Sequence, residues 1–138
     1  MSEARTPHDV VNPPGLAPAR GFSHAVIAAP GRTVYLGGQT AHGPDGELRG
    51  RTMVEQFDSA SLNVVTALAA AGARPGDLVS MQILVTDAAG YREALADIGE
   101  VWRRHFGTHY PAAALFEVSE LFDPAALVEL ICVAVVPS

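Results

Sequence analysis

The chain has 138 residues, and its 9 basic residues against 15 acidic ones give a formal net charge of −6. This length fits a single domain, and a hydrophobic content of 49% with 17% charged residues is typical of a globular chain, not a disordered one. The acidic balance argues against nucleic acid as the main partner, because neutralising phosphates requires clustered basic side chains. The single cysteine excludes an intrachain disulfide and argues against a structural zinc cluster.

The N-terminal part of the chain is rich in proline, which donates no amide hydrogen bond and interrupts both helices and strands. We therefore expect a flexible N-terminus over residues 1–12 and one domain over residues 13–138. The first residues lack the apolar core of a signal peptide, and the longest uncharged run, Ser59 to Ala73, is too short to span a bilayer. The sequence predicts a cytoplasmic protein that does not associate with membranes.

Short apolar segments and two helical patterns follow one another along the rest of the chain. A capping box formed by Thr52 and Glu55 begins the first helix, and Gly72 follows its end. Asp87 is expected to be a helix cap or a turn residue. In chain order we expect strands over residues 23–29 and 33–37, joined at Pro30-Gly31, a short optional strand near Glu47, a helix over 52–71, a strand over 78–86, a helix over about 90–106, and strands over 112–118 and 126–136.

This order, β-β-(β)-α-β-α-β-β, predicts an α+β fold, a two-layer sandwich in which a mixed sheet packs on two helices. Two helices can cover only one face of the sheet. The last strand is nevertheless apolar at almost every position, which is typical of a strand buried on both faces. A chain this short has nothing left for the second face, so we expect a homo-oligomer.

Glu129 is the only ionisable carboxylate within that last strand. Desolvation there would raise its pKa toward the range of a general acid or base, or else Glu129 lies at a wet rim or an oligomer contact. Cys132 lies in the same apolar strand, where a structural thiol is favoured over a nucleophile. Gln56 and Asn63 lie on the first helix, where solvent contacts are the default expectation.

His105 and His109 have the i, i+4 spacing of two metal ligands on one helix. Gly107 lies between them and should end the helix, so we expect no metal site. The glycines around Gly37-Gly38 do not have the spacing of a phosphate-binding loop, so we expect no nucleotide site.

Several short motifs occur in an order that resembles the RidA/YjgF family of reactive-intermediate deaminases. Each motif is weak alone, but together they cover about residues 13 to 136. The motifs are Phe22-Ser23-His24-Ala25-Val26, Val34-Tyr35-Leu36-Gly37-Gly38-Gln39, Ala71-Gly72-Ala73, Gly76-Asp77-Leu78, Tyr110-Pro111-Ala112 and Val128-Glu129-Leu130.

This resemblance implies a chorismate-mutase-like fold, a homotrimer and ligand clefts between the subunits. Typical members hydrolyse enamines and imines, such as 2-aminoacrylate, to a ketoacid and ammonia without a metal or organic cofactor. In the family, a glutamate that matches Glu129 is thought to hold the attacking water. The backbone groups of Gly38 and Leu115 would also line the cleft.

The chain departs from the family at three polar positions. Ala113 occupies the position of the arginine that grips the substrate carboxylate, Gly99 that of a pocket asparagine, and Phe22 that of a tyrosine. Losing a bidentate guanidinium weakens carboxylate binding and makes 2-aminoacrylate deamination by the usual route doubtful. Arg103 or Arg20 of a neighbouring subunit could supply a replacement charge.

The resulting cleft is wider, less cationic and more apolar, which suits a larger or neutral ligand. We therefore expect a RidA-like hydrolase or deaminase that acts on an imine, enamine or related reactive intermediate. One alternative is a non-catalytic trimer that binds a small apolar metabolite or a partner protein. A further alternative, a ribonuclease or translation inhibitor, is disfavoured by the net charge of −6.

Overall fold

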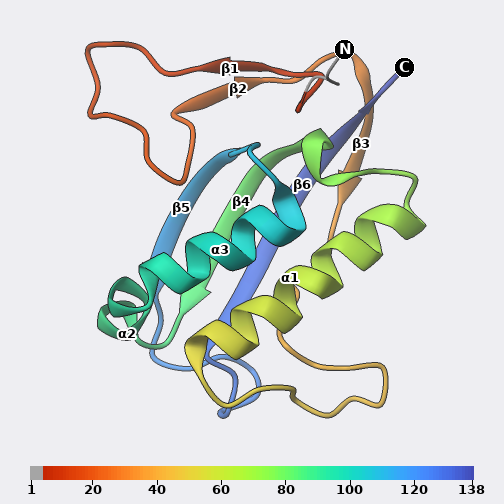
Figure 1. The fold of residues 1–138 in the computed structure, drawn as a ribbon. Coiled ribbons are helices and arrows are strands. Elements are labelled where there is room, and N and C mark those ends of the chain that lie inside the picture. Colours follow the sequence, from red (N-terminus) through yellow and green to blue (C-terminus); the bar gives the residue numbers. More distant parts are fainter. Residues whose placement is uncertain (1–4) are drawn as a thin grey trace.

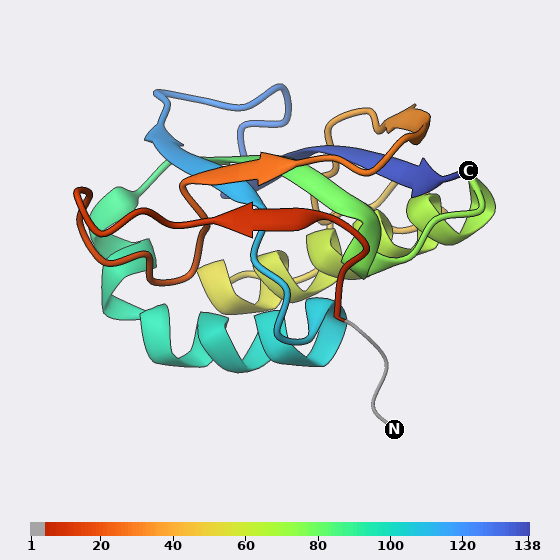
Figure 2. The ribbon, with the colours of Figure 1, turned by 90° about the horizontal axis from the view of Figure 1, so that it is seen from above.

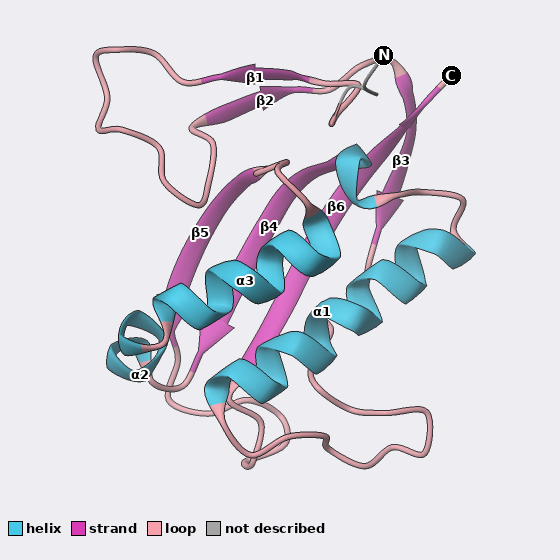
Figure 3. Ribbon diagram, in the orientation of Figure 1, coloured by secondary structure: helices cyan, strands magenta, loops and turns pink. Residues whose placement is uncertain are grey.

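The computed structural model describes residues 5–138, and a four-stranded sheet with two long helices on one face dominates it (Figures 1 and 3). The outer strand β5 runs parallel to β4, and the other neighbours are antiparallel, so the sheet is mixed. The predicted two-layer α+β fold is confirmed. In spatial order the strands are β3 (Gly31–Tyr35), β6 (Val128–Pro137), β4 (Leu78–Val85) and β5 (Ala112–Glu117).

The first helix, α1 (Met53–Ala70), has the predicted capping box. The Thr52 hydroxyl accepts a hydrogen bond from the Glu55 amide, and the Glu55 carboxylate accepts one from the Thr52 amide, both at 3.1 Å. Gly72 adopts a φ of 80°, a left-handed conformation that glycine reaches without a Cβ clash. Local sequence chemistry therefore sets both ends of this helix.

The single second helix expected over residues 90–106 is wrong, because two helices occupy this stretch. The short α2 (Ala88–Glu93) begins at Asp87, whose side chain accepts the Gly90 amide at 2.9 Å. The helix is interrupted at Ala94, which ends α2 and precedes α3 (Leu95–Phe106). Helix α3 then runs across the sheet beside α1. Neither glycine nor proline lies at the break, so periodicity alone does not reveal it.

A second, two-stranded sheet lies beyond one end of the main sheet (Figures 1 and 2). It pairs β1 (Asp9–Val11) with β2 (Ala25–Ile27). Residues 1–4 lie outside the described residues, but β1 lies within the segment 1–12 that was expected to be flexible. The buried His8 anchors this strand, because its ring bonds the Asp77 carbonyl at 2.9 Å and the Ala29 amide at 3.0 Å.

The two strands expected before and after Pro30-Gly31 therefore belong to different sheets. β2 pairs with β1, whereas β3 pairs with β6. The optional strand near Glu47 is reduced to an isolated bridge between His42 and Leu48. A one-turn helix, η1 (Pro75–Asp77), leads into β4.

Side chains alternate along β6 between two different environments. Val128, Leu130, Cys132 and Ala134 are buried beneath the helices. The alternate residues, Glu129, Ile131 and Val133, point away from the helices and are partly exposed. We call this side of the sheet the open face. Its other apolar residues, placed by strand register beside these three, are Tyr35, Leu84 and Phe116.

Gln56 and Asn63 do not point into solvent as expected. The Gln56 amide is buried and bonds the carbonyls of Gly50 and Ala125, while its oxygen accepts the Leu127 amide at 2.7 Å. Asn63 donates to the carbonyls of Thr40 and His42, both at 2.8 Å. Both side chains therefore fasten loops to α1, a role that their positions on a helix do not reveal.

Candidate functional site

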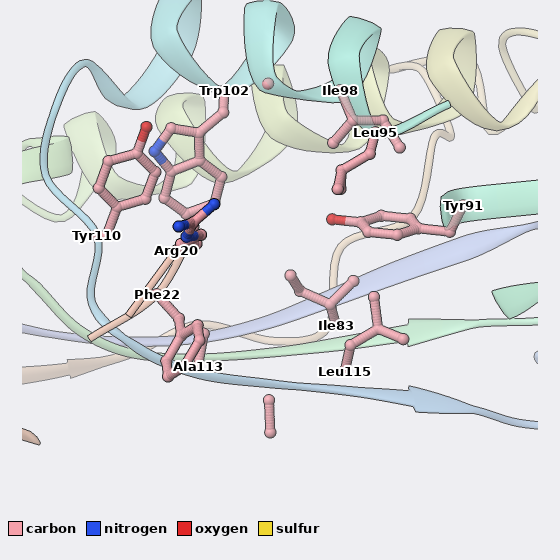
Figure 4. Close-up of a pocket in the computed structure, with 13 residues that line it drawn as sticks. Arg20, Phe22, Ile83, Tyr91, Leu95, Ile98, Trp102, Tyr110, Ala113 and Leu115 are labelled. Atoms are coloured by element: carbon pink, nitrogen blue, oxygen red, sulfur yellow. The ribbon is translucent and has the colours of Figure 1, made fainter. Parts of the chain in front are cut away.

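A cavity of about 340 Å³ lies between α2, α3 and the outer strand β5 (Figure 4). The loop before β2 forms one side of the cavity. Ile83 of β4 and Tyr110, which precedes Pro111, complete the lining. Its lining residues are Arg20, Gly21, Phe22, Ile83, Tyr91, Leu95, Ile98, Gly99, Trp102, Tyr110, Ala113, Ala114 and Leu115.

Two stacked aromatic rings form one wall of the cavity. The rings of Trp102 and Tyr110 are nearly parallel, at 6°, with centroids 5.4 Å apart. The Trp102 indole nitrogen donates to the carbonyl of His109 at 3.2 Å, and the side chain is almost fully buried. This contact and the neighbouring Phe106 ring, whose centroid lies 4.5 Å from that of the indole, hold the indole in place, so the wall is aromatic and rigid.

Tyr91 provides a polar group among aliphatic side chains. In Figure 4 its hydroxyl points into the cavity, between Leu95 and Ile83, toward the end where Arg20 and Tyr110 lie. Burial raises the pKa of Tyr91 to about 12, so the phenol stays protonated at neutral pH. Among the described residues the hydroxyl has no hydrogen-bond partner, and it can therefore donate to a ligand.

Arg20 is the one charged residue among the described residues that line the cavity. It precedes Gly21, which adopts a φ of 75°, and the chain then runs to Ser23. The Ser23 amide donates to the Pro111 carbonyl at 3.1 Å, and its hydroxyl bonds the Tyr110 carbonyl. These bonds hold the Arg20 loop against the chain that leads into β5, at the cavity wall.

Four of the residues predicted from the family motifs come together here. Ala113 and Leu115 face the helices because they pair with Met81 and Ile83, whose side chains are buried on that side of β4. Phe22 reaches the same cavity from the loop before β2, and Gly99 from α3. The cavity thus joins residues that are far apart in the sequence.

Glu129 and Gly38 lie together at another place. A Cβ at residue 38 would overlap the Glu129 carboxylate, so glycine is required for the two to approach this closely. Glu129 pairs with Leu84, and Leu84 pairs with Phe116, which places all three on the open face. Within one chain, Glu129 is therefore separated from the cavity by the sheet itself.

The other candidate residues have structural surroundings. Burial raises the pKa of the Cys132 thiol to about 12, which leaves no thiolate for nucleophilic attack at neutral pH. His105 bonds Asp58 at 2.6 Å, whereas His109 bonds the Leu78 carbonyl at 2.7 Å, so the two rings do not converge. Among residues 5–138, no three metal-ligating side chains of the His, Cys, Asp and Glu types gather in one place.

Tyr91, Trp102 and Tyr110 were not among the site residues predicted from the sequence. The structure shows that Tyr91 of α2 and Leu95, Ile98 and Trp102 of α3 border one cavity. Arg20 was considered only as a residue from a neighbouring subunit, and the structure places it at the cavity of its own chain. Arg103, the other candidate, does not line the cavity.

Over the described residues, no helix combines the length and the hydropathy that a bilayer span requires.

Comparisons with known proteins agree on one family. The family model described as "Endoribonuclease L-PSP" matches residues 14–136. The RutC family protein y4sK of Sinorhizobium fredii is 33% identical over 92 residues, which cover 66% of this chain and 70% of that protein. Protein MMF1 of Saccharomyces cerevisiae, a mitochondrial protein, is 26% identical over 77% of this chain and 70% of its own length.

Solved structures give the same result. YyfB of Yersinia pestis, a member of the conserved Rid protein family of unknown function, superposes with a TM-score of 0.85 at 31% identity and covers 94% of this chain and 98% of its own. RidA from the Antarctic bacterium Psychrobacter gives a TM-score of 0.67 at 27% identity, over 87% of this chain and 92% of its own. Because the family model spans nearly the whole chain, this protein belongs to the Endoribonuclease L-PSP family, the RidA/YjgF family that its motifs predicted.

Proposed function

We propose that this protein is a Rid-type hydrolase or deaminase that acts on an imine, an enamine or a related reactive intermediate bound in the cavity beside Ala113. One observation carries the proposal. In a chain of this family, Phe22, Gly99, Ala113 and Leu115 line a single cavity of about 340 Å³, although they come from three separate segments. A cavity of this size accommodates a small metabolite.

The reaction consists of two proton-coupled steps. Water adds to the carbon of the C=N bond, with its proton passing to a base, and ammonia leaves after the nitrogen has gained a proton. The products are a carbonyl compound and ammonia, so atoms and charge balance without an oxidant. A carboxylate suits the first step, and a protonated hydroxyl such as that of Tyr91 can donate a hydrogen bond in the second.

Glu129 is the proposed carboxylate, and it would have to come from a neighbouring subunit. In one chain Glu129 lies on the open face, whereas Ala113 and Leu115 point to the helix side. A homotrimer in which the open face of one subunit meets the edge of the next would bring the two together. The apolar residues of the open face support such an assembly.

The residue after Pro111-Ala112 is Ala113, where typical family members carry their arginine. Ala113 and Gly99 leave space there, and most of the lining is apolar. The proposed substrate is therefore larger than 2-aminoacrylate, because a three-carbon acid would leave much of the apolar wall uncovered.

Ammonia release from imines of graded size tests this function. We expect turnover by the wild-type protein, a decrease of kcat by about 100-fold or more in Glu129→Gln, and unchanged turnover in Glu100→Gln, an exposed exchange of the same kind on α3. Ala113→Arg should shift preference toward 2-aminoacrylate. Turnover that Glu129→Gln leaves intact would contradict the role of Glu129.

A non-catalytic binder is the second candidate, because no carboxylate of the described chain lines the cavity. Tight ligand binding without ammonia release from any imine would support it. Binding to RNA that weakens steeply with salt would instead favour the activity in the name of the family model.

A further inference from the structure

The position of Arg20 bears on the substrate class of the proposed reaction. Nine arginines supply all the basic side chains of this chain, which contains no lysine. Some of these arginines pair with carboxylates, as Arg49 does with Asp45 and Arg104 with Asp58. The guanidinium of Arg20 forms no ion pair or hydrogen bond with another described residue.

The described residues that line the cavity with Arg20 do not neutralise its charge. The other described lining residues of the cavity are aliphatic, aromatic or glycine, and none of them carries a charge. In Figure 4 the Arg20 side chain lies at the end of the cavity formed by Trp102 and Tyr110. Arg20 is exposed, so an anion can reach its guanidinium, and the apolar wall beside it offers the guanidinium no competing partner.

The rest of the cavity extends away from this charge. Ile83, Leu95, Ile98 and Leu115 form an aliphatic end, and the Tyr91 hydroxyl lies among them and points toward Arg20 (Figure 4). The stacked Trp102 and Tyr110 rings provide an aromatic wall close to the charge. A ligand that satisfies both ends has a carboxylate at one end and a bulky apolar group at the other.

We propose that Arg20, in place of the residue that follows Pro111-Ala112, binds the substrate carboxylate in this chain, and that the other end of the substrate is a branched aliphatic or aromatic group. The guanidinium takes the carboxylate in two parallel hydrogen bonds, as its planar fork allows. The C=N group then lies near the middle of the cavity, within reach of the Tyr91 hydroxyl. This inference rests on the proposed function for the imine, but the carboxylate site can be tested without turnover.

The test uses stable acids and the fluorescence of Trp102, the single tryptophan of the chain and a wall of the cavity. The probes are propanoate, 4-methylpentanoate, 3-phenylpropanoate and the neutral 3-phenylpropanamide. We expect affinity to rise by about fourfold for each methylene that the lining buries, and the acid to bind more tightly than its amide.

Three variants identify the cation. Arg20→Gln should weaken 3-phenylpropanoate binding by roughly 10- to 100-fold and leave the amide unchanged. Arg32→Gln, on the exposed strand β3, removes the same charge far from the cavity lining and should have no effect. Equal binding of the acid by Arg20→Gln and wild type would overturn the assignment, as would a loss confined to Arg103→Gln.

Failure of the inference differs from failure of the proposed function. If acids bind through Arg20 but no imine releases ammonia, the carboxylate site stands and the hydrolase proposal fails. If imines are hydrolysed and Arg20→Gln neither raises KM nor weakens binding of the acids, the hydrolase stands and the Arg20 site fails. Circular dichroism on each variant confirms that the fold is kept.

Discussion

His109 is a buried residue whose two ring nitrogens have different surroundings. Nε2 bonds the Leu78 carbonyl at 2.7 Å, which requires a proton on Nε2, and the buried Nδ1 has no hydrogen-bond partner. Burial lowers the pKa of His109 below the usual 6.5, with nearby His8 and Arg5 acting in the same direction. The folded protein therefore holds this ring in its neutral form.

A lowered histidine pKa destabilises the folded state in acid. As the pH falls through 6.5, the unfolded chain takes up a proton at His109 that the folded chain binds only at lower pH, so the free energy of unfolding decreases. His109→Gln keeps a donor toward Leu78 but cannot titrate. Urea unfolding at pH 7.5 and 5.5 should show a smaller loss of stability in the variant, and equal losses would contradict this account.

At the scale of elements, Gln56 joins α1 to the loop before it and to the loop that leads into β6. Gln56→Leu keeps the approximate volume but leaves the Gly50 and Ala125 carbonyls and the Leu127 amide without their partner. We expect a loss of about 2–4 kcal/mol in the free energy of unfolding, because unsatisfied buried groups are costly.

Thr66→Val is the matched control for this prediction. It exchanges a polar for an apolar side chain on the exposed side of the same helix, and we expect it to change stability by less than about 0.5 kcal/mol. If Gln56→Leu were equally mild, the loop contacts of Gln56 would not stabilise the fold.

Elements were predictable from the sequence where local chemistry determines them. Thr52, Glu55 and Gly72 determine the ends of α1, and the apolar run of β6 predicted a strand with one uncovered face. The break at Ala94 was not predictable, because nothing in its residues opposes a helix. The pairing of β1 with β2 joins two three-residue strands across a long loop, a contact that depends on the buried ring of His8.

The site was predictable only in part. Family motifs identified Phe22, Gly99, Ala113 and Leu115, and these line one cavity. The position of Arg20 at the cavity depends on the hydrogen bonds between its loop and the segment before β5. The hydrophobic periodicity of the sequence does not predict these bonds. The separation of Glu129 from the cavity follows from strand register, and register exists only once the strands have paired.

At the scale of the whole molecule, the open face and the cavity are two distinct features. Its apolar residues include Tyr35, 79% exposed, and Phe116, 49% exposed. An apolar surface of this kind is suited to a contact between subunits. The cavity, in contrast, is lined by residues of one chain. If the proposed homotrimer dissociates, ligand binding and the proposed catalysis should therefore respond differently.

Val133→Asp places a charge in the middle of the open face. Because an unpaired carboxylate is costly to bury, we expect the mass in light scattering to fall from that of the proposed trimer, three times 14.4 kDa, to that of one chain. Leu62→Asp, an exposed exchange on α1, should leave the mass of the proposed trimer unchanged. The dissociated Val133→Asp chain keeps Arg20 and the Trp102 wall, so it should still bind 3-phenylpropanoate, whereas ammonia release should be lost with the neighbouring Glu129. Ammonia release by a folded monomer would show that Glu129 of another subunit is not needed.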